Sequence, residues 1–414
     1  MTGPLEGIKV VDLSQVISGP WATMLLADQG AEVIKVEPSV GGEVLRPVPN
    51  FGRGGINSLI ANNNRGKLGL AIDLGSERGV ATLRRLVDTA DVVVQNFRPG
   101  VAERLGLSTE QLRSTNPGLV TCAITGFGPD GPWAERPVYD PIIQAMSGHV
   151  AVQVNPDIPI PDMVRSTVCD KATALMAAQA VTAALLARER TGIGQDVEIA
   201  MLDAAIAFFW PDGMMAHTVL AGDGWDDPPG GATMAATYRL TQCADGHLVY
   251  WVVQQSDMWN LARALGHPEW EHDERWADAE RRRLPENWAA FGAAIAAAFE
   301  VLPVEEAIRR LQEHDVPVGP VLSLEDMPRH EQVTHNGIVI DWVHPTAGPL
   351  RQAGPAAHFS ATPAEPQLRV PLHGEDTDDV LRSAGFTDDE IAELRAEGVV
   401  GVRSTEDLNG NRDG

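Results

Sequence analysis

The chain has little cysteine and few basic residues for its 414 residues. Its three cysteines, Cys122, Cys169 and Cys243, are far apart, so they offer neither a disulfide framework nor a zinc-binding pattern. Its 32 Lys and Arg are outnumbered by 57 Asp and Glu, which gives a formal net charge of -25. Nucleic acids and anionic membranes bind to basic surfaces, so this balance argues against both as partners. Any anionic ligand must meet a local basic patch.

Long apolar runs are also missing. The start, MTGPLEGIKVVDLS, has no apolar core of the kind found in signal peptides. The most apolar stretch, residues 172–187, is too short to span a bilayer, contains Gln179 and lies between Lys171 and Arg188. Together with the scattered cysteines, which suit a reducing compartment, these features predict a soluble, cytoplasmic protein.

The glycine fingerprints of phosphate-binding loops are absent. The turn after the first expected strand reads SQVISGP, which matches neither GxGxxG nor GxxxxGK[ST]. The glycine-rich segment NFGRGGIN (50–57) does not lie between a clear strand and a helix. Paired His residues at metal-ligand spacing and a GxSxG elbow are missing too. The sequence therefore disfavours a nicotinamide dehydrogenase and predicts no metal site.

Strand and helix patterns alternate through the first half of the chain. The β-branched run IKVVDL (8–13) precedes a helical run that ends at Gly30, and AEVIKVEP (31–38) follows as a second strand. The alternation continues through KLGLAIDL, a helix capped by Ser76, DVVVQNF, LVTCAITGFG and QDVEIAML. We therefore predict an α/β fold with a doubly wound, Rossmann-like parallel sheet and helices on both faces.

The pattern changes near residue 223, where DGWDDPPGGATM is rich in Gly, Pro and Asp. TYRLTQCADGHLVYWVV then predicts an antiparallel hairpin with Asp245 and Gly246 at its turn, and acidic, Ala-rich helices follow. We expect a large domain starting with residues 1–222, a small inserted α+β domain at 223–330, a return segment at 331–400 that completes the large domain, and a polar tail at 401–414.

One acid stands at the start of the long apolar helix expected over residues 171–190. In RSTVCDKATALMAAQ (165–179), Asp170 precedes residues that are almost all Ala, Leu and Met. Asp is a common helix cap, because its carboxylate accepts hydrogen bonds from free backbone N–H groups. From these residues alone, Asp170 is either a cap or a reactive carboxylate.

Seven sequence blocks occur in a fixed order between about residue 5 and about residue 400. They are LADQGAEVIKVEP, QNFRPGVAERLGL, YDPIIQAMSG, the Asp170 helix with RTGIGQDVEIAMLDA, CADGHLVYWVV, VPVGPV and PLHGEDTDDVL. In order and spacing they resemble the family III coenzyme A transferases, the CaiB/BaiF family, which also contains the α-methylacyl-CoA racemases. The resemblance implies an interlocked homodimer that acts on acyl-CoA and carboxylic acids.

The resemblance also implies a role for Asp170. In the transferases of this family, the acid that opens the long helix is the nucleophile, and this position is Asp170 here. Such a carboxylate attacks the thioester to give a mixed anhydride, which CoA thiolate then converts to an aspartyl thioester. We expect the helix dipole to keep Asp170 ionised and nearby N–H groups to stabilise the oxyanion. The rival nucleophile, Cys169, is expected to be a small buried residue.

A site for coenzyme A is implied at the strand ends. Its phosphates require well-placed cations in so acidic a protein. The implied residues are Val16 near the adenine, Asn96, Phe97 and Arg104 around the nucleotide, and the further cations Arg65, Lys67, Arg98 and Arg136. Pro38 stands where the family often has Arg, so we expect Lys35 or Arg46 to supply the missing positive charge.

Several departures from the family pattern bear on the substrate. Ile17 aligns with a glutamine that assists the formyl enzyme, so oxalate is a poor guess for the acceptor. Tyr139 stands where the racemases have the His that works with the central Asp, and Gln255 aligns with a supporting racemase Glu.

PPGG (228–231) is a remnant of the loop that closes over the site, and GEDT places Asp376 where the family has His. We therefore expect a transferase, with a racemase and a CoA-binding protein without turnover as the alternatives.

The racemase alternative makes a different prediction about the α-proton. A phenol such as that of Tyr139, with a reference pKa of about 10, is a poor base at neutral pH. We therefore expect no deuterium at the α-carbon when a 2-methylacyl-CoA is incubated with the protein in deuterated water over many CoA exchanges. Incorporation as fast as CoA exchange would overturn the transferase assignment.

Overall fold

The computed structural model describes residues 3–48, 52–153, 161–222, 234 and 238–402. The chain divides into two compact units, residues 1–230 with 336–414 and residues 231–335. The second unit is therefore an insertion in the first, and each is described by itself. PPGG (228–231) and residues 403–414 of the polar tail lie outside the described residues.

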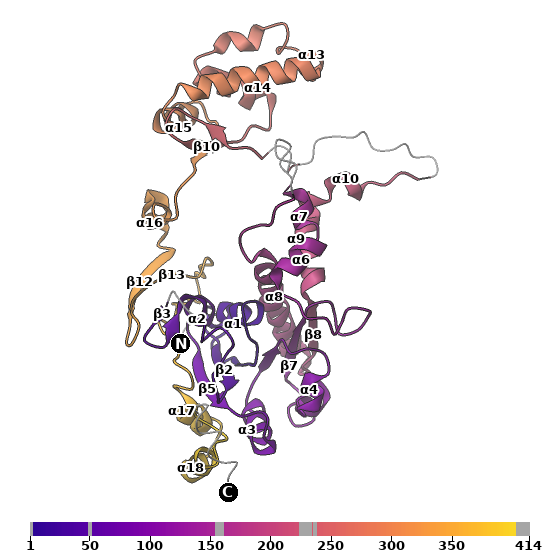
Figure 1. Ribbon diagram of the computed structural model, residues 1–414, viewed down its shortest axis with the longest axis vertical. Coiled ribbons are helices and arrows are strands. Elements are labelled where there is room, and N and C mark those ends of the chain that lie inside the picture. The colour runs from indigo at the N-terminus through magenta and orange to yellow at the C-terminus, as the bar shows by residue number, and fades with distance from the viewer. Residues whose placement is uncertain (1–2, 49–51, 154–160, 223–233, 235–237, 403–414) are drawn as a thin grey trace. The chain divides into compact units, whose positions relative to one another are not determined.

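A six-stranded parallel sheet forms the centre of the first unit (Figure 1). In spatial order its strands are β5 (Leu68–Ile72), β2 (Glu32–Pro38), β1 (Lys9–Asp12), β6 (Val92–Gln95), β7 (Val120–Thr125) and β8 (Asp196–Ala200). All neighbours in the sheet pair in parallel. The chain builds outward from β1 first to one edge and then to the other, which is the doubly wound order. The predicted α/β fold is confirmed.

Both faces of this sheet are covered by helices, because alternate side chains of a strand point to opposite sides. Val10 and Cys122 pack on one face against α1 (Ser18–Ala27), α8 (Val168–Thr191) and α9 (Met201–Gly213). Val11 and Val93 pack on the other face. The helices there are α3 (Glu77–Val87), α5 (Thr109–Arg113), α17 (Thr377–Ser383) and α18 (Asp388–Ala396). As expected, Ser76 caps α3 by accepting from the Gly79 N–H group.

Shorter elements complete the first unit. Its remaining helices are α2 (Ser58–Asn64), α4 (Val101–Arg104), α6 (Asp140–Met146), α7 (His149–Val152) and α10 (Met215–Thr218). Two antiparallel strand pairs are formed by β3 (Gly52–Arg53) with β4 (Ile56–Asn57) and by β12 (Val339–His344) with β13 (Gly348–Ala353).

The return segment binds the free edge of β5 through Asp376. The Gly69 N–H group donates to the Asp376 carboxylate at 2.7 Å, and the Asp376 N–H group donates to the Gly69 carbonyl at 2.9 Å. Arg369 holds the same carboxylate at 2.7 Å. An open strand edge exposes unpaired N–H and C=O groups, so Asp376 takes the place of a neighbouring strand. This contact gives the acid in GEDT a structural role.

The second unit combines a small antiparallel sheet with helices. The sheet order is β11 (Val318–Pro320), β10 (His247–Tyr250) and β9 (Thr241–Gln242), so the predicted hairpin around Asp245 is confirmed. Its helices are α12 (Gln255–Ala264), α13 (Ala279–Arg282), α14 (Pro285–Glu300) and α15 (Val304–Glu313), with 3-10 turns η1 (Pro268–His272) and η2 (Met327–Arg329). Helix α16 (Glu331–Asn336) leads back to the first unit. Trp259, Trp270, Trp276 and Phe291 form an aromatic core.

Helix α8, the longest in the described part of the chain, contains the most apolar stretch of the sequence. Its first turn carries Asp170 and its last turn carries Arg188 and Arg190. Within the described residues, every helix is too short or too polar to cross a bilayer.

Candidate active site

Two turns meet where the strand order of the large sheet reverses, between the carboxyl ends of β1 and β6. The Gln15 N–H group donates to the Asn96 side-chain oxygen at 2.8 Å, and the Asn96 amide donates to the Gln15 carbonyl at 2.7 Å. Helices leave the sheet on opposite faces from these neighbouring strands, so a crevice opens between them. Doubly wound folds bind their ligands at this place, and the topology therefore selects it as the candidate site.

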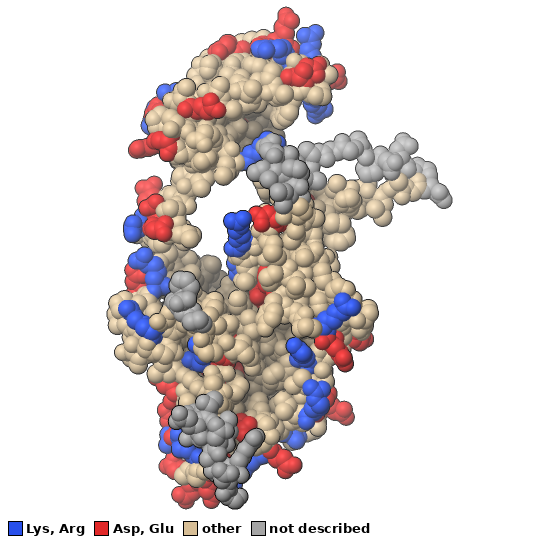
Figure 2. Space-filling view, viewed as in Figure 1, with Lys and Arg blue, Asp and Glu red and all other residues tan. Residues whose placement is uncertain are grey.

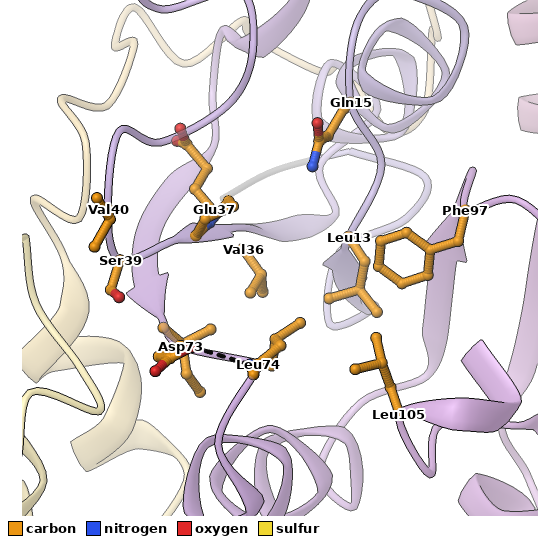
Figure 3. Close-up of a pocket in the computed structure, with 13 residues that line it drawn as sticks. Leu13, Gln15, Val36, Glu37, Ser39, Val40, Asp73, Leu74, Phe97 and Leu105 are labelled. Atoms are coloured by element: carbon orange, nitrogen blue, oxygen red, sulfur yellow. Dashed lines mark hydrogen bonds between the residues drawn. The ribbon is translucent and has the colours of Figure 1, made fainter. Parts of the chain in front are cut away.

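A cavity of about 360 Å³ opens beside this junction. Leu13, Phe97 and Leu105 lie next to one another along its wall, and Val36 forms its floor (Figure 3). Gln15 lies at its edge. An apolar slot with few polar groups suits a flat ring system such as a purine. The structure thus places Phe97, one of the residues expected around a nucleotide, at this cavity.

Two of the expected cations lie close to this cavity. Arg98 follows Phe97 directly, and Arg104 ends α4, one residue before Leu105 of the cavity wall. Both residues are exposed. Neither side chain forms a hydrogen bond or an ion pair with another residue in the described part of the chain. Their charges are therefore available to the phosphates of a nucleotide.

The structure gives Arg65 and Lys67 another role. Arg65, which is 2% exposed, donates to both carboxylate oxygens of Asp28 at 2.9 and 2.6 Å. Lys67, which is 0% exposed, donates to the carboxylate of Asp12 at 2.8 Å and to the side chain of Asn64 at 2.9 Å. Buried cations that already have these partners cannot reach a phosphate in solvent. We therefore correct the expectation that Arg65 and Lys67 bind coenzyme A.

The side chains expected to compensate for Pro38 are also engaged. Lys35 is buried and pairs with Glu43 at 2.8 Å. Arg46 donates two N–H groups to Glu37, both at 2.6 Å. Neither is free to replace an arginine at position 38. Arg136 is exposed and stacks on the Trp133 ring, 3.8 Å from its centroid, so it remains a candidate cation.

Asp170 lies in the first turn of α8, and the residue is 7% exposed. The helix begins at Val168, earlier than expected, and its N-cap is Thr167. The N–H groups of Cys169 and Asp170 donate to the carboxylate of Asp140 at 2.8 and 2.9 Å. Asp140 therefore fills the capping role expected of Asp170. These two N–H groups are not free to stabilise an oxyanion, which corrects the expectation from the sequence.

The environment of Asp170 favours its neutral form. Burial, followed by the negative charge of Asp140, raises the pKa of Asp170 to about 7, against hydrogen bonds from the side chain and backbone of Ser18 that lower it. The expectation that the helix dipole keeps Asp170 fully ionised is therefore wrong. A raised pKa in a buried carboxylate is typical of catalytic acids, bases and nucleophiles.

Ser18 links this carboxylate to the cavity. Gln15 lines the cavity, and Ser18, three residues later at the start of α1, lies close enough to Asp170 to lower the pKa of its carboxyl group. Three steps between neighbouring Cα atoms span at most about 11 Å. A ligand whose nucleotide occupies the cavity therefore needs only a short extended arm to reach Asp170. Coenzyme A has such an arm in its pantetheine chain.

The three residues that bear on the substrate, Ile17, Tyr139 and Gln255, lie in different elements. Ile17 is the N-cap of α1 and directly precedes Ser18. Tyr139 is the N-cap of α6, directly precedes Asp140 and is 65% exposed. Gln255 begins α12 in the second unit and is exposed.

Two further observations narrow the chemistry of the site. Cys169 is fully buried, and burial raises the pKa of its thiol to about 12, so it cannot compete as a nucleophile. Among the described residues, no group of three or more His, Cys, Asp or Glu is arranged to hold a metal ion. Among the described residues near Ser18, Asp170 is thus the candidate for a reactive side chain.

Comparison with known proteins decides the family. A sequence model described as CoA-transferase family III matches residues 5–377. The chain belongs to this family. The family III CoA-transferase described here is 32% identical over 427 residues to the formyl-CoA:oxalate CoA-transferase of Streptomyces avermitilis, covering 97% of this chain and 100% of that one. The succinyl-CoA:glutarate CoA-transferase of Mus musculus is 31% identical over 411 residues, covering 97% of this chain and 91% of that one.

A solved structure agrees with this assignment. The CAIB/BAIF family protein from Brucella suis superimposes with a TM-score of 0.79 at 31% sequence identity, covering 93% of this chain and 100% of that one. The family predicted from the seven blocks is therefore confirmed, and so is CoA-transferase activity as the function.

The pKa of Asp170 predicts the pH dependence of this CoA-transferase. If Asp170 attacks the thioester, its carboxylate must be ionised, so kcat/KM should fall as the pH drops below about 7. Asp140→Asn removes the neighbouring negative charge but keeps one oxygen for the N–H groups of α8, so the acidic limb should move to lower pH. The pH profile of CoA exchange measures this limb. Asp130→Asn, at an exposed acid, serves as the control. An acidic limb that stays in place in Asp140→Asn would contradict the assignment.

Proposed function

We propose that this CoA-transferase moves coenzyme A between carboxylic acids through a covalent intermediate on Asp170. The observation that carries the proposal is a buried carboxylate with a pKa of about 7, held by Ser18 three residues from a nucleotide-sized cavity. A reaction between two acids nearly conserves the thioester's energy, so it needs no ATP. Each acid must, however, pass through an activated state, and a protein carboxylate can provide one.

The proposed reaction has four steps. A carboxylate oxygen of Asp170 attacks the acyl-CoA carbonyl, the C–S bond breaks, and a mixed anhydride forms with release of CoA thiolate. The thiolate attacks the Asp170 carbonyl carbon and expels the first carboxylate, which leaves an aspartyl thioester. The second carboxylate attacks this thioester and releases CoA thiolate again. The thiolate then attacks the acyl carbon of the new anhydride, which gives the product thioester and restores Asp170.

The surrounding side chains have separate proposed roles. Ser18, which lies beside Asp170 and lowers its pKa, orients the carboxylate. Asn96 fixes the turn that contains Val16, and Phe97 contacts the adenine. The cations proposed for the CoA phosphates are Arg98, Arg104 and Arg136. This assignment makes the first unit, expected at 1–222 and 331–400, the CoA-binding domain, and the second unit, expected at 223–330 and found at 231–335, the inserted domain.

The substrate acids follow from the side chains next to Asp170. The named relatives act on formate, oxalate, succinate and glutarate as acids or thioesters. In this chain Ile17, beside Ser18, is apolar and cannot hydrogen-bond a second carboxylate. We therefore propose acids with apolar atoms next to the reacting carboxyl group in place of oxalate. The exposed hydroxyl of Tyr139 is available to orient the acyl group.

Replacement of Asp170 tests the chemistry directly. Asp170→Asn should reduce CoA exchange by at least about a thousandfold, since the amide cannot form the anhydride. The fold should survive, because Asp140 makes the capping contacts of α8. CoA exchange is measured by mass spectrometry with a panel of free acids, and hydroxylamine should convert Asp170 to a hydroxamate in enzyme loaded with acyl-CoA. Full exchange by Asp170→Asn would refute the mechanism.

We propose further that the chain forms the interlocked homodimer of its family and works in the cytoplasm. Large apolar side chains are exposed on three helices of the first unit, and Figure 2 shows the surface over α9 largely without charged side chains. They are Ile142 and Met146 on α6, Phe208 and Trp210 on α9, and Met215 on α10. Apolar patches of this kind mark surfaces that a partner covers. The three free cysteines suit a reducing compartment.

The assembly can be measured by light scattering. We expect the mass of a dimer, and dilution should not release folded monomers, because interlocked chains separate only when they unfold. Phe208→Glu, which places a charge on the apolar surface, should lower the yield of dimer. A stable, active monomer of the unmodified chain would contradict the proposal.

A further inference from the structure

We propose that Glu43 is a positioning residue for the reaction, because it holds Val16 in the backbone conformation that presents Ser18 to Asp170. The inference rests on the proposed function, in which Asp170 is the reacting group. Glu43 lies in the loop after β2 and has no described contact with Asp170. It therefore acts through the turn between β1 and α1.

This turn contains an unusual backbone angle. Val16 has φ of 72°, and Asp315 is the one other non-glycine residue with a positive φ in the described part of the chain. The branched Cβ of valine makes this left-handed conformation a genuine outlier. Strain of this kind lowers the population of a conformation by roughly tenfold or more unless the surroundings hold it. A specific contact must therefore stabilise Val16.

Glu43 provides that contact. One of its carboxylate oxygens accepts the Val16 N–H group at 2.7 Å, and the other pairs with Lys35 at 2.8 Å. Its own N–H group donates to Glu37 at 2.8 Å, so the loop that carries Glu43 is fixed as well. Lys35 also donates to the carbonyl of Ser14, two residues before Val16. One buried ion pair thus holds the turn at two places.

The held turn connects the two halves of the site. Before Val16, Gln15 lies at the edge of the cavity and is hydrogen-bonded to Asn96. After it, Ser18 begins α1, which packs against α8 in the same core, and Ser18 lies beside the carboxyl group of Asp170, whose pKa it lowers. If Val16 relaxed to an ordinary negative φ, the path from Gln15 to Ser18 would change direction, and Ser18 would leave Asp170. The Glu43 contact therefore sets the alignment of cavity and carboxylate.

A matched pair of variants isolates the Val16 contact. Lys35→Met/Glu43→Gln removes the charges but keeps an oxygen for the Val16 N–H group, whereas Lys35→Met/Glu43→Leu has a similar shape without the acceptor. We expect kcat of the Leu variant to be at least about tenfold below that of the Gln variant, with a smaller change in KM for acyl-CoA. Thermal unfolding checks that both variants are folded. Equal kcat values in two folded variants would overturn the inference.

Relief of the strain gives a second readout. Glycine adopts positive φ without a steric penalty, so adding Val16→Gly to the Leu variant should recover at least about threefold in kcat. No recovery would count against Glu43 acting through Val16. If the Leu variant does not fold, the single variant Glu43→Gln takes its place. Lys35 is retained in that variant, so the amide oxygen turns toward Lys35 and the Val16 N–H group loses its acceptor. Adding Val16→Gly should then again raise kcat. Asp170→Asn is measured in the same assay. Full CoA exchange by this variant would refute the proposed function, whereas loss of exchange would leave the comparison of the Glu43 variants valid.

Discussion

The carboxylate of Asp12, at the end of the central strand β1, is the buried anion around which the site is built. It accepts hydrogen bonds from Lys67 at 2.8 Å, from Thr23 of α1 at 2.7 Å and from the Ser14 N–H group at 2.9 Å. Burial favours the neutral acid, but the charges of Lys67 and Lys35 hold the pKa of Asp12 well below its usual range. Removal of one partner from such a pair leaves an unpaired charge in the core, which costs about 3–5 kcal/mol.

The proposed nucleophile, Asp170, depends on this anion through a short chain of contacts. Asp12 fixes the start of the turn between β1 and α1, and the pair of Lys35 and Glu43 fixes its middle. The turn thereby sets the position of Ser18, which lies beside Asp170. The same residues that stabilise the fold therefore align the nucleotide cavity with the carboxylate. This explains why an acidic chain keeps several of its cations buried. They neutralise carboxylates inside the protein, whereas Arg98 and Arg104, the cations proposed for the CoA phosphates, are exposed.

Much of the fold was predictable because its signals are local. Runs of β-branched residues alternate with helical runs at the spacing that a doubly wound sheet requires, and the position of Asp170 follows from the apolar helix after it. Asn96 and Phe97 follow a strand end directly, so the topology alone brings them to the crevice. The predicted hairpin of the second unit is equally local, since its strands are joined by a tight turn.

The residues whose predicted roles are wrong have partners that are distant in sequence. A basic side chain is expected at the surface, yet Arg65 meets Asp28 and Lys67 meets Asp12, 37 and 55 positions away. The acid that caps α8 is Asp140, 30 residues before Asp170, whereas the sequence alone offers Asp170, the carboxylate nearest the helix start, as the cap. Hydrophobic periodicity shows which faces are buried, but it does not show which charges are buried as pairs.

The central claim is that Asp170 becomes covalently acylated during CoA transfer, and oxygen-18 in the acceptor carboxylate tests it most directly. In the proposed mechanism the bridging oxygen of the second anhydride comes from the acceptor and stays on Asp170 when CoA thiolate takes the acyl group. After a few turnovers, mass spectrometry of the peptide containing Asp170 should therefore show oxygen-18 in its side chain and in no other residue. An unlabelled Asp170 after many turnovers would contradict the account.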